Sequence, residues 1–130
     1  MTALFAFCLG AVLPPADGLP GAKDCDPSGF LRRLKKESPL VFRLSFYLSA
    51  WVLVISPLIT VFLPLPAFLL PKSLLDAHVM RMSRSRLYGL RQALLMVKTV
   101  AGMCWGADPQ VRRALGLKPY GEDPGTWRTD

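Results

Sequence analysis

The longest uncharged run in this chain extends from Leu44 to Pro71. A helix that crosses a bilayer needs about 20 predominantly apolar residues, and this run is long enough. Three prolines interrupt it, at positions 57, 64 and 66. Each of them removes a backbone donor and disfavours helix in the preceding residue. We therefore expect a continuous helix over Leu44–Ser56, with a weaker extension as far as Leu63.

The charges beside this run do not indicate a simple crossing. Five basic residues lie within 20 positions of each of its ends. Lysine and arginine bias, which normally sets the orientation of a single span, is therefore absent. The pattern fits a proline-bent segment that inserts into one leaflet, and it fits equally a helix that another subunit covers. Trp51 lies inside the run and not at an end, so we interpret it as a packing residue of this docking segment.

Length and composition predict one domain over residues 1–130. The net charge of +7 would suit anionic lipid headgroups, nucleic acid or an acidic protein surface. Cys8, Cys25 and Cys104 are odd in number and share no short spacing. They are therefore expected to be buried free thiols, without a disulfide framework or a thiolate zinc site.

Residues typical of helix ends, together with helical spacing of apolar residues, predict an all-α fold of about four to five helices. The apolar stretch Ala3–Leu13 has no basic residue before it, so we expect a short buried helix there and not a signal sequence; an uncleaved membrane anchor is the alternative. Asp-Pro pairs at positions 26–27 and 108–109 have the signature of a helix start, and Gly116 is placed to end the last helix. No strand pair is predicted.

One long amphipathic helix is expected from Leu74 to about Cys104, begun by a capping box between Ser73 and Asp76. Its apolar stripe would contain Leu87, Leu90, Leu94, Val97 and Ala101. On another face, Arg84, Arg91 and Lys98 follow one another seven residues apart. We expect these three to contact lipid headgroups or an acidic protein patch. Nucleic acid is a poorer partner because few exposed aromatic residues are available to stack on bases.

The candidate polar sites are weak. His78 is the only histidine, and Asp76, two residues away, does not share its side of a helix. A structural or interface histidine is therefore expected, with no catalytic or metal-binding role. Ser83, Ser85 and Tyr88 could bind a phosphate or lipid headgroup beside the neighbouring arginines, but we favour a solvated basic surface. No nucleophile motif or phosphate-binding loop occurs, so we expect neither an enzyme nor a small-molecule substrate for this chain.

The order of the landmarks resembles the gluconate 2-dehydrogenase subunit 3 family, the small subunits of flavin dehydrogenases of the glucose-methanol-choline type. The resemblance begins with a helix that ends at Val12-Leu13-Pro14-Pro15. It continues after an amphipathic helix with Gly102-Met103-Cys104-Trp105-Gly106-Ala107-Asp108-Pro109. Leu115-Gly116 and Trp127-Arg128 extend it towards the carboxyl end.

The resemblance implies a non-catalytic accessory subunit that stabilises or anchors a large flavoprotein. FAD and the substrate would belong to that partner, and this chain would hold no cofactor or metal. Membrane lipid headgroups are the second expected partner. The predicted contact residues are Trp51, Arg84, Arg91, Lys98 and Trp105. The alternative is a small structural membrane protein of another assembly, such as a respiratory or photosynthetic complex.

Overall fold

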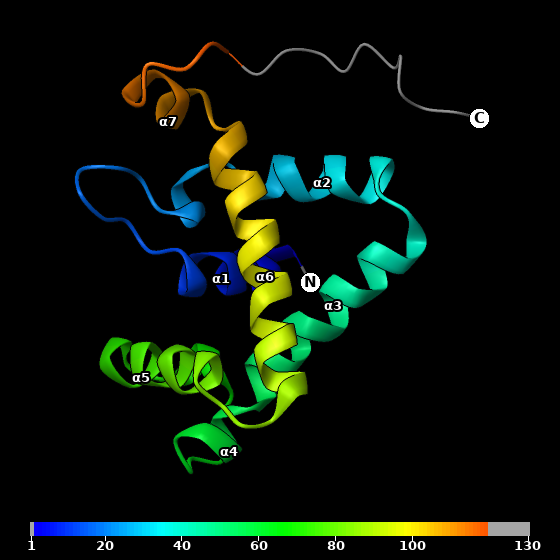
Figure 1. Cartoon of the computed structure of the whole chain (residues 1–130), viewed down its shortest axis with the longest axis vertical. Helices are drawn as coiled ribbons and strands as arrows, with labels where there is room; N and C mark the ends of the chain where they lie inside the picture. Colours follow the sequence, from blue (N-terminus) through cyan, green and yellow to red (C-terminus); the bar gives the residue numbers. More distant parts are fainter. Residues whose placement is uncertain (1, 120–130) are drawn as a thin grey trace.

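The computed structural model describes residues 2–119, and this part of the chain is helical with no strand. Its elements are α1 Thr2–Val12, η1 Ala22–Asp24, α2 Pro27–Glu37, α3 Leu40–Ile55, α4 Pro57–Thr60, η2 Ala67–Leu69, α5 Lys72–Ser83, α6 Tyr88–Ala107 and α7 Pro109–Ala114 (Figure 1). The all-α prediction is confirmed. The number of helices was underestimated, because prolines and one serine-rich turn divide segments that were expected to be continuous.

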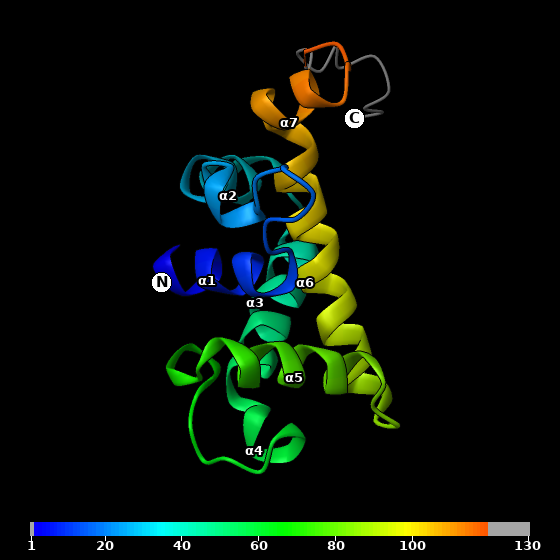
Figure 2. The ribbon, with the colours of Figure 1, turned by 90° about the vertical axis from the view of Figure 1, so that its left-hand side faces the viewer.

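Helix α6 is the axis of the fold. Its most extensive contact is with α3, and it also packs against α1, α5 and α7. The two views agree that α2, α1 and α5 lie at successive heights along α6, with α4 beyond α5 (Figures 1 and 2). The apolar segment α3–α4 and the amphipathic helix α6 are therefore neighbours in space.

The core lies where α1, α3 and α6 meet. Leu9 of α1, Phe46 and Leu53 of α3, and Val97 of α6 are fully buried. The ring of Phe5 stacks on Tyr47 with centroids 4.9 Å apart. The predicted stripe of α6 is buried except for Leu87, which precedes the helix and is exposed.

The predicted ends of the short helices are confirmed. Asp26 caps α2 by accepting a hydrogen bond from the backbone N–H of Gly29 at 3.1 Å. Asp108 caps α7 by accepting from Gln110 N and Val111 N. Gly116 has a φ of 67°, a left-handed conformation that glycine adopts readily, and it follows the last turn of α7.

The single long helix predicted from Leu74 to Cys104 is wrong. The chain leaves α5 at Arg84 and re-enters helix at Tyr88, although no proline or glycine lies in the connection. The Ser85 hydroxyl accepts from Leu87 N, which gives the backbone an alternative to helical hydrogen bonding. The predicted capping box is also wrong, because α5 begins at Lys72 after Pro71 and no side chain caps it.

The uncharged run folds into α3, α4 and η2. Helix α3 begins at Leu40, before the predicted Leu44, and ends next to Pro57 as expected. The extension is only the four residues of α4. Within residues 2–119, no helix combines the length and the apolar character that a bilayer crossing requires.

Candidate docking face

Large apolar side chains lie exposed along one side of α3 and continue past it. Positions 41, 44, 48, 51 and 55 alternate in steps of three and four residues, which places them on one side of a helix. The exposed fraction is 68% for Leu48 and 80% for Phe62. We call this surface the apolar face; it consists of Val41, Leu44, Leu48, Trp51, Ile55, Leu58, Ile59, Phe62, Leu65, Phe68 and Leu69.

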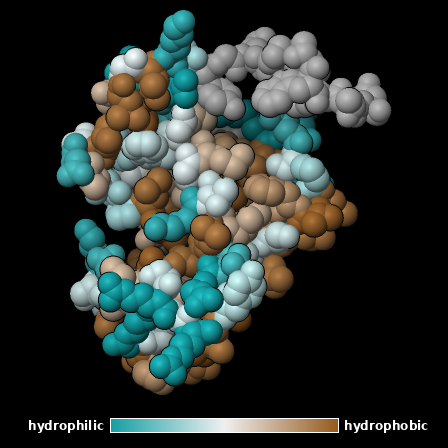
Figure 3. Space-filling view, viewed as in Figure 1, coloured by the Kyte–Doolittle hydropathy of each residue, from teal (hydrophilic) through white to brown (hydrophobic). Residues whose placement is uncertain are grey.

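The opposite side of α3 supplies the core. Phe46, Ala50 and Leu53 are fully buried against α1 and α6. Helix α3 is therefore apolar on both sides, and only one side is covered by the described part of the chain. Figure 3 shows hydrophobic atoms at the right-hand and lower edges of the molecule, over α3 and α4.

Pro57 leaves a carbonyl of α3 without its helical donor, and His78 supplies a replacement. In a continuous helix, the carbonyl of Leu53 would accept from the backbone N–H four residues later, but that residue is proline and has no N–H. Nε2 of His78 lies 2.9 Å from the Leu53 oxygen. Because a carbonyl only accepts, Nε2 carries the proton, and a side chain of α5 replaces the missing helical donor.

The other ring nitrogen of His78 is also engaged. Its Nδ1 is paired with the hydroxyl of Thr60 in α4, so the neutral ring accepts there while it donates to Leu53. Burial lowers the pKa of His78 from its ordinary value of 6.5, and the hydrogen bond to Leu53 opposes this shift. The ring is fully buried and bonded through both nitrogens, which gives this histidine a position that joins α5 to α3 and α4.

Basic side chains border the apolar face. Arg81 of α5 donates from Nη1 to the carbonyl of Thr60 at 2.7 Å, which places its guanidinium beside the end of α4. Arg43 donates to the carbonyl of Lys35 at 2.7 Å, near the beginning of α3. Lys72 is exposed and directly follows Pro71, the end of the uncharged run. Positive charge therefore lies at both ends of the face.

A groove of about 660 Å³ continues the apolar face towards α6. Leu48 and Val52 line it from α3, and Leu87, Leu90 and Met96 line it from the α6 side. Beside Leu87, Arg91 donates to the carbonyl of Ser85 and lies 6.0 Å from the ring centroid of Tyr88. This places one basic residue near the Leu87 end of the groove.

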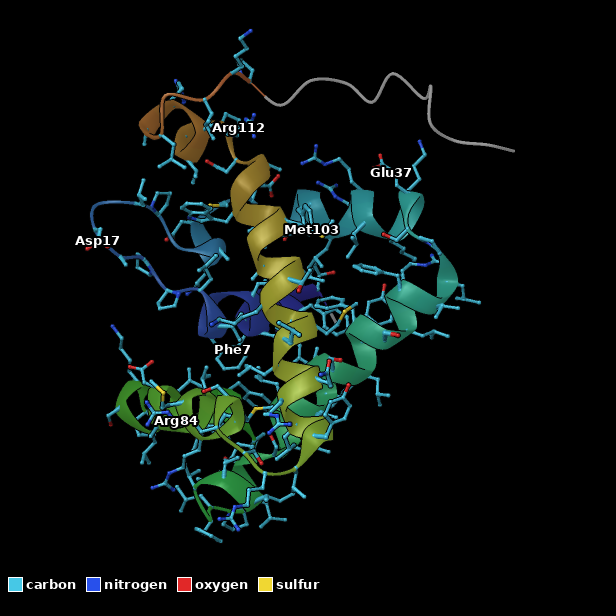
Figure 4. All side chains as sticks on the ribbon, in the orientation of Figure 1. Phe7, Asp17, Glu37, Arg84, Met103 and Arg112 are labelled. Atoms are coloured by element: carbon cyan, nitrogen blue, oxygen red, sulfur yellow. The ribbon has the colours of Figure 1, made fainter. Side chains whose placement is uncertain are left out.

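The predicted basic stripe is only partly assembled. Arg91 and Lys98 are exposed and lie seven residues apart on α6. Arg84, however, follows the last residue of α5 and belongs to a different helix (Figure 4). The three residues do not form one helical stripe, because the chain turns between Arg84 and Tyr88. The hydroxyls of Ser83 and Ser85 in this turn are bonded to the backbone of Met80 and Leu87.

The two predicted tryptophan contacts have different surroundings. Trp51 is 46% exposed at the centre of the apolar face, so it is available to a partner and is not a packing residue of this chain's own core. Trp105 is partly buried, and its Nε1 donates to the carbonyl of Pro20 at 2.8 Å. Trp105 therefore ties the end of α6 to the loop before η1.

The three cysteines are free and buried, as predicted. Burial raises the pKa of the Cys8 thiol to about 12 and that of Cys104 to about 12. The pKa of Cys25 rises to about 11 through burial and the nearby carboxylates of Asp108 and Asp24. At neutral pH these thiols are protonated and therefore weak nucleophiles. Within residues 2–119, no group of three His, Cys, Asp or Glu side chains is arranged to hold a metal ion.

Sequence reasoning missed most of the individual residues of the apolar face. The signal was present in the steps of three and four residues from Val41 to Ile55, but the inward side of α3 is equally apolar. The role of His78 was also missed. Its signal was Pro57 itself, which leaves a carbonyl without its helical donor.

Comparisons of this chain with models of protein families, with curated proteins and with solved structures give no significant match.

Proposed function

We propose that this chain is a non-catalytic accessory subunit of a membrane-associated flavin-dependent dehydrogenase. In this role its apolar face is the anchoring surface, and the chain helps to hold a large flavoprotein subunit that contains FAD. The observation that carries the proposal is the apolar face itself, with Leu48 and Phe62 mostly exposed on a chain that already has a separate core. The order of sequence landmarks supports the choice of a flavoprotein partner.

The size of the face argues that it is covered in the working molecule. Fully burying one Leu, Ile or Phe side chain contributes about 1.5–3 kcal/mol. Several such side chains stand side by side along α3 and α4, and contiguous apolar surface of this kind is typical of protein or membrane contacts. Single exposed apolar residues would carry no such implication.

The test is a purification of the tagged chain from its native host in mild detergent, followed by mass spectrometry and a flavin absorbance spectrum. A large flavoprotein in stoichiometric amount, with a flavin chromophore, is the expected result. The double substitution Leu48→Gln and Ile55→Gln should reduce the amount of this complex found in the membrane fraction before detergent is added. Leu95→Gln changes an exposed leucine outside the face and serves as the matched control. A colourless preparation without a flavoprotein contradicts the proposal.

A second candidate is a small structural protein of another membrane assembly, such as a respiratory or photosynthetic complex. It is favoured by the fact that the apolar face does not by itself specify a flavoprotein. Recovery of unrelated membrane subunits in place of a flavoprotein, in the same purification, would select this candidate.

A further inference from the structure

The part of the chain that contains the apolar face is strongly basic. Between Ser38 and Ala107 the only acidic residue is Asp76. The basic residues of the same range are Arg43, Lys72, Arg81, Arg84, Arg86, Arg91 and Lys98. Most of the acidic residues of the described chain lie outside this range, before α3 or after α6. An occupant of the face would therefore meet apolar surface with a positive border.

Three of these residues are close to the face, one by a hydrogen bond and two by their positions in the chain. Arg81 is held at the end of α4 by the carbonyl of Thr60, and Lys72 follows the last residue of the uncharged run. Arg86 directly precedes Leu87, which lines the groove shared with Leu48. Positive residues thus occur at the end of α4, after η2 and next to Leu87 of the groove.

The exposed side chains of the uncharged run offer almost no hydrogen-bonding groups. From Leu44 to Pro71, Ser45 is the only exposed residue with a hydroxyl, amide or charged side chain. Tyr47 is half-buried, and Trp51 adds one indole N–H. Protein interfaces carry about one hydrogen bond per 100–200 Å². Hydrocarbon chains require none. The chemistry of the surface therefore favours lipid over a protein partner.

A second copy of this chain is a poor occupant of the face because its charge is the same. In a twofold contact through the apolar face, the basic borders of both copies would be brought together. Like charges placed close together at an interface are unfavourable. An anionic surface would pair with them.

We propose that the apolar face rests on a bilayer that contains anionic phospholipids. Helix α3, which is about 24 Å long for its 16 residues, lies along the membrane plane. Its outer leucines and Trp51 enter the boundary between headgroups and acyl chains, while Lys72, Arg81 and Arg86 lie at the level of the phosphates. This inference rests on the proposed function for the identity of the assembly, but the lipid contact itself needs only this chain.

The test is flotation of the purified chain with vesicles of phosphatidylcholine alone and with vesicles that contain about 30% phosphatidylglycerol. We expect binding to the anionic vesicles that is at least about tenfold tighter and that weakens as salt screens the charges. Leu48→Gln with Ile55→Gln should remove binding to both vesicles. Leu95→Gln should leave it unchanged.

Two charge variants distinguish the effect of the residues next to the face from the effect of net charge on vesicle binding. Lys72→Glu with Arg86→Glu should lower the affinity for anionic vesicles by about tenfold or more. Arg32→Glu with Lys118→Glu makes the same change in net charge at exposed positions of α2 and the segment after α7. At about 0.15 M salt the screening length is roughly 8 Å, so this second pair should have much less effect.

Fluorescence quenching of Trp51 shows independently whether this side chain enters the acyl-chain region. Lipids with brominated acyl chains should quench the fluorescence of the wild-type chain, and the lipid-dependent quenching should disappear in Trp51→Phe.

Equal binding to neutral and anionic vesicles overturns the proposed anionic specificity. Absence of vesicle binding, with a dimer or a monomer in light scattering, overturns the membrane contact altogether. If the flavoprotein is still recovered in that case, the association with a flavoprotein stands and the lipid contact fails. Vesicle binding without a flavoprotein would support the lipid contact and contradict the proposed function.

Discussion

His78 of α5 donates a hydrogen bond from Nε2 to the carbonyl oxygen of Leu53 in α3, at 2.9 Å. That carbonyl is without its helical donor because Pro57 occupies the position four residues later. The same ring is paired with Thr60, so one imidazole joins α5 to both sides of the proline break. The orientation of α4, and with it part of the apolar face, thus depends on a buried histidine.

Replacement of His78 by alanine should therefore be strongly destabilising. The substitution leaves the buried Leu53 carbonyl without a partner and opens a cavity where the ring was. We expect the free energy of unfolding to fall by about 2–4 kcal/mol. Urea unfolding followed by circular dichroism measures it. A loss below about 0.5 kcal/mol would show that the ring does not support this junction.

The effect of His78→Ala should depend on Pro57. Pro57→Ala restores a backbone N–H that can bond to the Leu53 carbonyl, so the histidine becomes less necessary. In a double-mutant cycle, we expect His78→Ala to cost about 1 kcal/mol less in the Pro57→Ala background. Additive effects of the two substitutions would contradict the assigned link between proline and histidine.

The stability of the protein should also depend on pH through His78. Burial lowers the pKa of this histidine below its value of 6.5, so the unfolded chain binds the proton at a higher pH than the folded one. Above about pH 6.5 both states are neutral, and the full contribution is present. As the pH falls below that value, the free energy of unfolding decreases, by at most about 1.4 kcal/mol per pH unit, until the folded pKa is reached.

Urea unfolding between about pH 5 and pH 8 checks this dependence. The variant His78→Gln keeps an amide donor of similar reach but does not titrate, so its curve should be flatter over the same interval. An equal slope in both proteins would assign the pH dependence to other groups.

The sequence predicted the helical class and most helix ends because these depend on local chemistry. Asp26 and Asp108 act as caps through their own side chains, and Pro57 stops α3 through its missing N–H. The division of α5 from α6 was not predictable in this way, because it depends on Ser85 accepting from Leu87 in a turn that lacks proline and glycine. The covered side of α3 was not predictable either, since both sides are apolar and tertiary contacts with α1 and α6 decide which one is buried.

The two sides of α3 should respond differently to truncation. Leu53→Ala removes a fully buried side chain and should lower the free energy of unfolding by about 2–5 kcal/mol. Leu48→Ala removes a mostly exposed one and should change it by no more than about 0.5 kcal/mol. Equilibrium unfolding of the two variants makes the comparison. Similar losses at both positions would mean that Leu48 is buried within the isolated chain.

Charge reversal of the predicted basic residues tests their role in association. Replacement of Arg84, Arg91 and Lys98 by Glu should weaken membrane or partner association while the chain remains folded, because all three side chains are exposed. Among single variants, Arg91→Glu should also lower stability, by about 1 kcal/mol, since Arg91 donates to the carbonyl of Ser85. Membrane fractionation and co-purification measure association, and circular dichroism measures folding. Unchanged association of the triple variant would remove these residues from the contact.

The three thiols should be inert in the folded protein. Burial raises the pKa of Cys8 and of Cys104 to about 12, and that of Cys25 to about 11, so almost no thiolate is present at pH 8. Because the thiolate is the nucleophile, an aromatic disulfide reagent should label none of the three rapidly until urea unfolds the chain. Absorbance of the released thiol counts the reactive groups. Rapid labelling of Cys25 without denaturant would show that the packing around η1 opens locally. Because η1 lies against α1 and α6, its opening would expose this thiol before the rest of the core.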